Sequence, residues 1–174
     1  MDSRAVIEAV EDGTVEIGFC VLYHQRPGLL FEPLFREPLD VVCRRDHTLG
    51  MRGTPVAWDD IALAEFISNG SAAAIASDHA AMMVERSSLQ ARNVTSILAM
   101  VEAGLGITVL PRLCRHQSSA AITFLPLDDS AAERTVGWIR TSERDPLPAS
   151  YHLVQELKQV IQRRSADMDS IMTT

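Results

Sequence analysis

The sequence predicts an α/β fold, in which strands and helices alternate along the chain and form a mainly parallel sheet covered on both faces. Three observations support this prediction. Helical and strand patterns follow one another, residues 93–111 run from helix to glycine to strand, and residues 150–164 carry an apolar stripe at helical spacing. With 174 residues, of which 47% are hydrophobic, the chain can bury the core of one domain or of two small lobes.

Before residue 93, the pattern changes from helix to strand several times. Residues 3–12 favour a helix that ends at Gly13, and residues 14–19 alternate apolar and polar side chains as a strand does. Proline and glycine at positions 27 and 28 separate this unit from the next extended segments. The elements expected after them are strands at 29–34 and 38–45, a helix at 58–64, a strand at 66–67, a polar turn at 68–71, an alanine-rich helix at 72–87 and a short strand within 88–94.

The segment 93–111, NVTSILAMVEAGLGITVLP, is the clearest unit of the chain. Thr95 or Ser96 can cap the helix, Gly104 suits its C-terminal end, and the β-branched residues that follow favour a buried strand. The start of such a helix attracts a carboxylate, although a plain cap without a ligand is the simpler interpretation. The glycines at 104 and 106 do not form a dinucleotide loop, because Val109 replaces the third glycine and the strand follows the helix.

After residue 111, the pattern returns to strands and then ends in a helix. A loop or helical turn is expected at 112–119, strands at 122–127 and 134–141, and a rigid proline-containing turn at 145–148. In the last helix, Leu153, Val154 and Leu157 share one face, and Arg163 and Arg164 lie where the helix dipole favours cations. Residues 166–174 are polar and are expected to fray.

Composition excludes several classes of protein. The net charge is −7 and no long basic run exists, which argues against the chain itself binding nucleic acid. The three cysteines lie far apart, and the five histidines show no metal-ligand spacing, so we expect buried thiols, no metal and no cofactor. We find neither a signal-peptide core nor an apolar run long enough to cross a membrane, and therefore expect a soluble, cytoplasmic protein with no membrane partner.

The sequence gives little support for a catalytic function. Ser77, Asp78 and His79 have the residue types of a catalytic triad, but adjacent residues of a helix point in different directions. Cys20 and His24 could form a thiolate pair, but no motif for oxyanion donors accompanies them. We therefore expect no catalytic residues and no enzyme.

Several segments resemble the effector-binding domain of LysR-type transcriptional regulators. These are MVEAGLGITVLP at 100–111, AVIEAVEDGTVEIGF at 5–19, LLFEPLFREPLDVVCRRDHTL at 29–49, VAWDDIALAEFI at 56–67 and ERTVGWIRTSERDPLPASYHLVQEL at 133–157. Each motif is loose, but their order and spacing match over almost the whole chain.

The resemblance implies a type 2 periplasmic-binding-protein-like pair of α/β lobes, with an effector bound in the cleft between them. Lobe I would comprise residues 1–62 and 140–165, and lobe II residues 63–139, with 166–174 as a tail. Glu16 stands where the family usually has Asp, and Thr48 replaces the proline that usually follows the histidine. The chain also lacks the helix-turn-helix and starts after the first strand and helix of the domain, so we expect an incomplete first lobe and DNA binding only through a domain missing from this chain.

Effector contacts are expected in loops that follow strands, at the carboxyl edge of the sheet. For each candidate the simpler interpretation is structural: a turn at 68–71, a helix cap at 95–96 and core packing at 20–22. The candidate ligand-binding residues are Ser68, Asn69, Gly70, Ser71, Thr95, Ser96, Cys20, Val21 and Leu22.

The favoured hypothesis is an effector-sensing domain of a LysR-type regulator that binds a small organic molecule, with a carboxylate as the natural class, and that forms a homo-oligomer. Two alternatives stay open. One is a stand-alone solute-binding or enzymatic protein of the same fold, which should show a titratable pair or a signal peptide. The other is a dimerisation module that needs no ligand and acts through its incomplete lobe.

Overall fold

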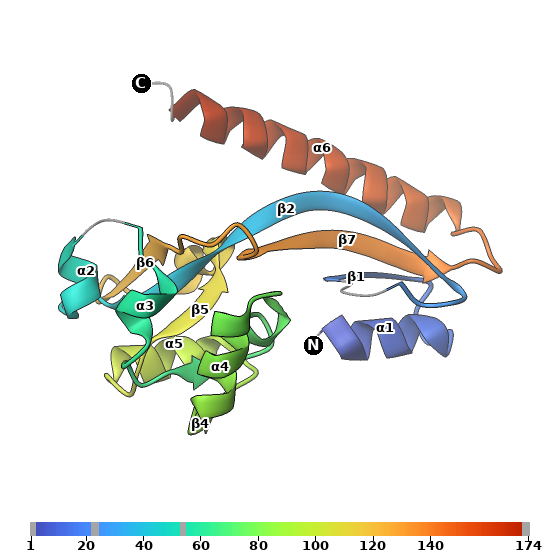
Figure 1. The fold of residues 1–174 in the computed structure, drawn as a ribbon. Coiled ribbons are helices and arrows are strands. Elements are labelled where there is room, and N and C mark those ends of the chain that lie inside the picture. Colours follow the sequence, from blue (N-terminus) through green and yellow to red (C-terminus); the bar gives the residue numbers. More distant parts are fainter. Residues whose placement is uncertain (1–2, 22–24, 53–54, 172–174) are drawn as a thin grey trace. The chain divides into compact units, whose positions relative to one another are not determined.

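The computed structural model describes residues 3–21, 25–52 and 55–171, with side chains described as far as Arg163. The chain forms two compact units: Met1–Arg36 with Thr135–Thr174, and Glu37–Arg134. Both boundaries fall inside long strands, β2 (Leu29–Arg44) and β7 (Glu133–Thr141), so each of these strands contributes residues to both units (Figure 1). The lobe boundaries expected from the sequence, at 62/63 and 139/140, stay a prediction about the ligand-binding lobes.

In the first unit, helix α1 (Ser3–Glu11) packs on an antiparallel sheet. Strand β1 (Ile17–Val21) pairs with β7 so that Phe19 lies opposite Trp138. The helix approaches closely because Gly18 has no side chain: a Cβ there would lie 2.5 Å from a methyl group of Val6. The core beneath the helix comprises Ile7, Val10, Cys20 and Ile139.

Helix α6 (Pro148–Ile171) belongs to the same unit, where its start is fixed by Glu16. The Glu16 carboxylate accepts a hydrogen bond from the Leu147 N–H at 2.7 Å and another from the Ser150 hydroxyl. An acidic group at this end also complements the helix dipole. The helix continues to Ile171 and not only to the expected end at 164, because neither glycine nor proline interrupts it.

The second unit is built around the C-terminal half of β2. Strands β5 (Thr108–Pro111) and β6 (Ile122–Pro126) pair antiparallel with β2 on its two sides, with Val41 opposite both Val109 and Leu125. The short strands β3 (Ile67–Ser68) and β4 (Leu89–Gln90) pair in parallel. A parallel bridge between Phe66 and Ile107 joins β3 to the start of β5.

The expectation of mainly parallel sheets is not confirmed. Within the described residues, the registers of β1 with β7 and of β2 with β5 and β6 are all antiparallel, while β3 and β4 are parallel. The two segments expected at 29–34 and 38–45 form the single strand β2, which crosses between the units and offers both edges to antiparallel partners. Parallel pairing is retained where a helix connects the strands, as the crossover geometry requires.

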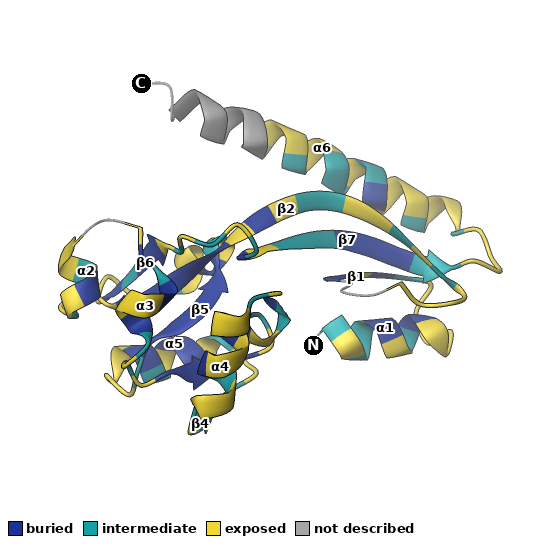
Figure 2. Ribbon diagram, viewed as in Figure 1, coloured by how far each residue is buried: buried dark blue, intermediate teal, exposed yellow. Residues whose placement is uncertain are grey.

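The core of the second unit lies on both faces of this sheet, in the dark blue regions of Figure 2. One face is covered by α2 (Thr48–Arg52), α3 (Trp58–Ile61) and α4 (Asp78–Arg86), and the other by α5 (Val94–Glu102). The helix expected at 72–87 is wrong in one respect: it is divided into η1 (Ala72–Ala74) and α4. The break follows from extended backbone at Ile75 and Ser77, the residue that precedes α4.

Candidate functional site

The parallel pairing of β3 with β4 brings together the two loops that the sequence singled out in the second unit. Ser68 ends β3 and lies opposite Gln90, which ends β4. The Ala91 N–H donates to the Ser68 carbonyl at 3.1 Å, so the two chains leave the sheet side by side. The turn at 68–71 and the start of α5 therefore follow neighbouring strand ends, at the edge where open α/β sheets bind ligands.

Within the first loop, the Asn69 side chain is fully engaged in the fold. It is 5% exposed; its amide donates to the Thr108 hydroxyl at 2.8 Å and to the Val109 carbonyl at 3.0 Å. Its carbonyl oxygen accepts from the N–H groups of Ser71 and Ala72. Asn69 therefore stabilises the turn, in agreement with the simpler interpretation of residues 68–71 as a structural turn.

At the second loop, Asn93 caps helix α5. Its side-chain oxygen accepts from the N–H of Thr95 at 2.8 Å and from that of Ser96 at 3.4 Å. The expectation that Thr95 or Ser96 supplies the cap is therefore wrong, because the helix begins at Val94, two positions earlier than a cap at Thr95 requires and three earlier than one at Ser96 requires. Both hydroxyls are exposed and take part in no hydrogen bond within the described residues, and the same holds for the partly buried Ser71 hydroxyl.

The third group of candidates belongs to the first unit. Cys20 is 4% exposed and packs against Ile7 and Val10, which agrees with the core-packing interpretation. Val21 is also buried, and its N–H donates to the Ser3 hydroxyl at 3.1 Å. Leu22 lies outside the described residues, as does His24.

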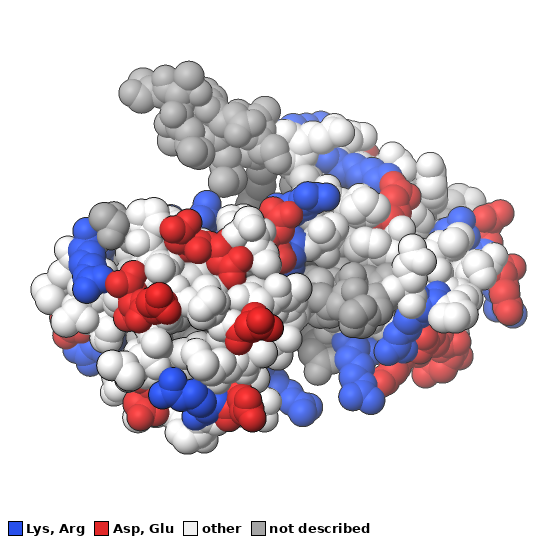
Figure 3. Space-filling view, in the orientation of Figure 1, with Lys and Arg blue, Asp and Glu red and all other residues white. Residues whose placement is uncertain are grey.

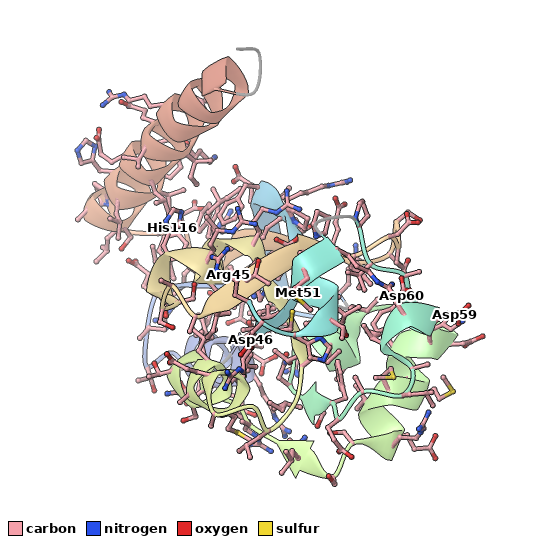
Figure 4. The ribbon with its side chains drawn as sticks, turned by 90° about the vertical axis from the view of Figure 1, so that its left-hand side faces the viewer. Arg45, Asp46, Met51, Asp59, Asp60 and His116 are labelled. Atoms are coloured by element: carbon pink, nitrogen blue, oxygen red, sulfur yellow. The ribbon has the colours of Figure 1, made fainter. Side chains whose placement is uncertain are left out.

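Two hollows on the described surface of the second unit include no candidate residue. One, of about 80 Å³, is lined by backbone and side chains between Ala62 and Phe66 together with Met83 and Arg86. The other, of about 170 Å³, lies at the start of β5 and is lined by Arg44, His47, Ala64, Glu65, Gly104, Gly106 and Ile107. Figure 4 labels Arg45 and Asp46, which follow β2 on this side of the unit. Both hollows are smaller than a typical ligand pocket of several hundred Å³.

Two of the three residues at 77–79, Ser77 and His79, lie near the carboxylate of Asp129. The Asp129 carboxylate accepts from the Trp58 indole N–H at 2.6 Å and from the Ala131 N–H at 2.8 Å. Burial tends to raise the pKa of Asp129, but the hydrogen bonds from Trp58, Ala131 and Ser77 and the nearby His79 lower it overall. Ser77 and His79 both lower the pKa of the Asp129 carboxyl, so the structure assigns these two residues a role beside Asp129.

The three cysteines are free and buried, as the sequence indicated. Burial raises the pKa of the Cys20 and Cys114 thiols and raises that of Cys43 to about 11. A thiol with a raised pKa is a weak nucleophile near neutral pH. These residues are therefore packing elements in the described structure.

Two buried ion pairs next to the unit boundary were not anticipated. Glu37 is 2% exposed and accepts two hydrogen bonds from Arg134, at 2.9 and 2.8 Å, and one from the Leu113 N–H. Asp40 is 0% exposed and accepts two hydrogen bonds from Arg112, at 2.9 and 2.7 Å. Both acidic residues stand in strand β2 next to apolar residues, but this local pattern does not reveal the distant partner of either.

Figure 3 shows acidic side chains among the Lys and Arg residues on the visible face of the molecule. This mixture agrees with the net charge of −7 and differs from the clustered cations that contact phosphates. No helix of the described residues is long and apolar enough to cross a membrane.

The sequence pattern of the LysR substrate binding domain matches residues 1–162. The chain belongs to this family. A LysR-type relative is the HTH-type transcriptional regulator YbhD of Escherichia coli (strain K12), described as uncharacterized, with 32% identity over 131 residues. The match covers 69% of this chain but 39% of YbhD, so the chain spans about two fifths of that relative's length.

Solved LysR effector-binding domains share the fold. The BenM effector-binding domain with benzoate superimposes with a TM-score of 0.74 at 19% identity, over 95% of this chain and 78% of that one. A Corynebacterium glutamicum OxyR C206 mutant gives a TM-score of 0.76 at 16% identity, over 99% of this chain and 56% of that one. The QuiR effector-binding domain with shikimate gives 0.69 at 16% identity, over 97% and 79% of the two chains. At these identities, the likeness establishes the α/β fold of the LysR domain.

Proposed function

We propose that this chain senses a small organic effector, held in the cleft that the two-lobed fold implies, and transmits binding to a DNA-binding domain of the same regulator. A carboxylate is the favoured class of effector. The supporting observation is the parallel pairing of β3 and β4, which places the turn at 68–71 beside the start of α5. Family members are ligand-binding domains of regulators, which favours a sensor over an enzyme.

In the second unit, the side-chain groups available to a ligand are some of those that the sequence suggested. Asn69 and Asn93 are committed to internal hydrogen bonds, whereas the hydroxyls of Ser71, Thr95 and Ser96 have no such bond within the described residues. Hydroxyl groups can donate to a carboxylate oxygen without first breaking a protein contact. Cys20, Val21 and Leu22 remain proposed contacts from the other lobe.

The test is a thermal-shift titration of the full chain with benzoate, shikimate, amino acids and other small carboxylates. A ligand that binds the native state raises the melting temperature in a saturable manner. The double variant Thr95→Ala/Ser96→Ala is expected to abolish the rise while leaving the melting temperature without ligand nearly unchanged, because both side chains are exposed. Ser130→Ala, which removes another exposed hydroxyl of the same unit, is the matched control and should retain the response.

A response that survives the double variant would place the ligand elsewhere and contradict the proposed site. A cooperative melt that no compound moves would argue for the alternative, a dimerisation module. Homo-oligomer formation and a cytoplasmic location are part of the same proposal, and light scattering on the purified chain measures the first.

A further inference from the structure

The larger hollow of the second unit lies where three segments meet: β2 ends at Arg44, α5 ends at Glu102, and β5 begins at Thr108. Its volume of about 170 Å³ is comparable to the roughly 150 Å³ of an apolar cavity that binds one benzene molecule. The hollow therefore has room for a molecule of about six non-hydrogen atoms. Its lining includes no residue of the turn at 68–71 or of the start of α5.

Backbone contacts hold the walls of this hollow in place. The Ile107 N–H donates to the Glu65 carbonyl at 2.8 Å. Glycine at position 106 permits this approach, because a Cβ there would lie 2.5 Å from the same carbonyl oxygen. At Gly104, where φ is 77°, a Cβ would lie 3.8 Å from Cδ of Arg44, so glycine leaves this space open. The hollow is therefore preformed by the backbone.

The two basic residues that line the hollow already have partners. The Arg44 guanidinium donates to both carboxylate oxygens of Asp46, which Figure 4 labels, and to the Glu102 carbonyl at 3.3 Å. The Asp46 carboxylate thereby balances its charge. In His47, Nδ1 accepts a hydrogen bond from the Leu49 N–H at 3.2 Å, so the ring hydrogen lies on Nε2 and the ring is neutral.

Glu65, in contrast, lines the hollow with a carboxylate that is available to a ligand. The side chain is exposed, and its carboxylate takes part in no hydrogen bond or ion pair within the described residues. The carbonyl end of α5, two positions before Gly104, adds partial negative charge on the same side of the unit. The unbalanced charge of the hollow is therefore negative, and it favours a cation.

We infer that this hollow binds a small protonated amine, whose ammonium group pairs with the Glu65 carboxylate. The carbon chain of the amine lies against the apolar part of the lining, formed by Gly104, Gly106 and Ile107. A neutral molecule of the same shape lacks the ion pair, and a carboxylate would meet the like charge of Glu65. The site therefore selects the charge opposite to that of the effector class proposed for the cleft, and it does not depend on that proposal.

The experiment is an NMR titration of the full chain at constant ionic strength, with butylammonium chloride as the probe. The amide signals of Gly104, Gly106 and Ile107 should shift in a saturable manner, with a dissociation constant on the order of 1 mM. Butanol, which has the same chain length and no charge, should bind about fivefold more weakly, because an exposed ion pair contributes no more than this factor. Butyrate should produce no saturable shift of these signals.

One substitution and its matched control test the role of Glu65. Glu65→Gln keeps the shape of the side chain and should reduce the affinity for butylammonium about fivefold, to that of butanol. The fold should be unchanged, because the side chain is exposed. Glu85→Gln removes another exposed carboxylate of the same unit and should retain the wild-type affinity.

Three results would overturn the inference: no saturable shift at the hollow with butylammonium, equal affinities for butylammonium and butanol, or wild-type affinity in Glu65→Gln. Shifts confined to the signals of Thr95 and Ser96 would place the amine at the proposed effector site and would also overturn it. The effector titration is read at those two residues, so either proposal can fail while the other holds.

Discussion

At the scale of single residues, Asp129 links the loop before β7 to α3 through its bond with the Trp58 indole. Its lowered pKa means that the ionised form stabilises the fold at neutral pH and that this contribution is lost as pH falls through the pKa in the folded state, below the ordinary value of 3.8. Asp129→Asn should therefore lower the melting temperature at pH 7 and have a much smaller effect below pH 3. Thermal unfolding of both proteins at the two pH values measures this difference.

The buried carboxylate of Asp40 predicts an asymmetry between two substitutions. Arg112→Ala leaves a fully buried charge with only Arg115 nearby, at 3.6 Å, and should lower the free energy of unfolding by about 3 kcal/mol. Asp40→Asn removes the buried charge, and Arg112, whose side chain is 39% exposed, can turn to water. The loss should then be closer to about 1 kcal/mol. Urea unfolding of both variants tests the order, and equal losses would contradict the assignment of Asp40 as the group that needs its partner.

At the scale of elements, the cap of α5 separates a structural role from a binding role. Asn93→Ala should lower the free energy of unfolding by about 1 kcal/mol, because two N–H groups lose their acceptor. Ser96→Ala, three positions later, should change it by less than about 0.5 kcal/mol, since the hydroxyl is exposed. Chemical denaturation compares the two. The reverse order would restore Ser96 as the cap that the sequence suggested.

The elements also show what sequence reasoning can and cannot supply. The segment 94–111 was predictable as helix and strand because its periodicity, Gly104 and Pro111 are local signals. The choice of Asn93 rather than Thr95 as the N-cap could not be predicted from the sequence. Either side chain can accept hydrogen bonds from the N–H groups of the first turn, and the backbone geometry decides which of them does so. The antiparallel neighbours of β2 and the partners of Glu37 lie more than 60 residues away in the sequence, and no local pattern encodes such a pairing.

At the scale of the whole molecule, each unit contains one tryptophan, Trp58 in the second and Trp138 in the first. Because β2 and β7 belong to both units, we expect both to unfold in one cooperative transition. The variants Trp58→Phe and Trp138→Phe each leave one tryptophan as the fluorophore. In each variant, the urea midpoint measured by tryptophan fluorescence should agree with the midpoint measured by circular dichroism. Two separate midpoints within a single variant, by fluorescence and circular dichroism, would show units that unfold independently.

The division of the chain has a consequence for its synthesis on the ribosome. The second unit is one continuous segment, whereas the first combines residues from both ends of the sequence. Translation proceeds from the N-terminus, so β1 is made long before β7, its antiparallel partner. Residues 17–21 are therefore without β7 while about a hundred further residues are polymerised over several seconds or more. This interval is when a nascent chain most needs a chaperone, and when neighbouring chains on one messenger RNA are close enough to meet.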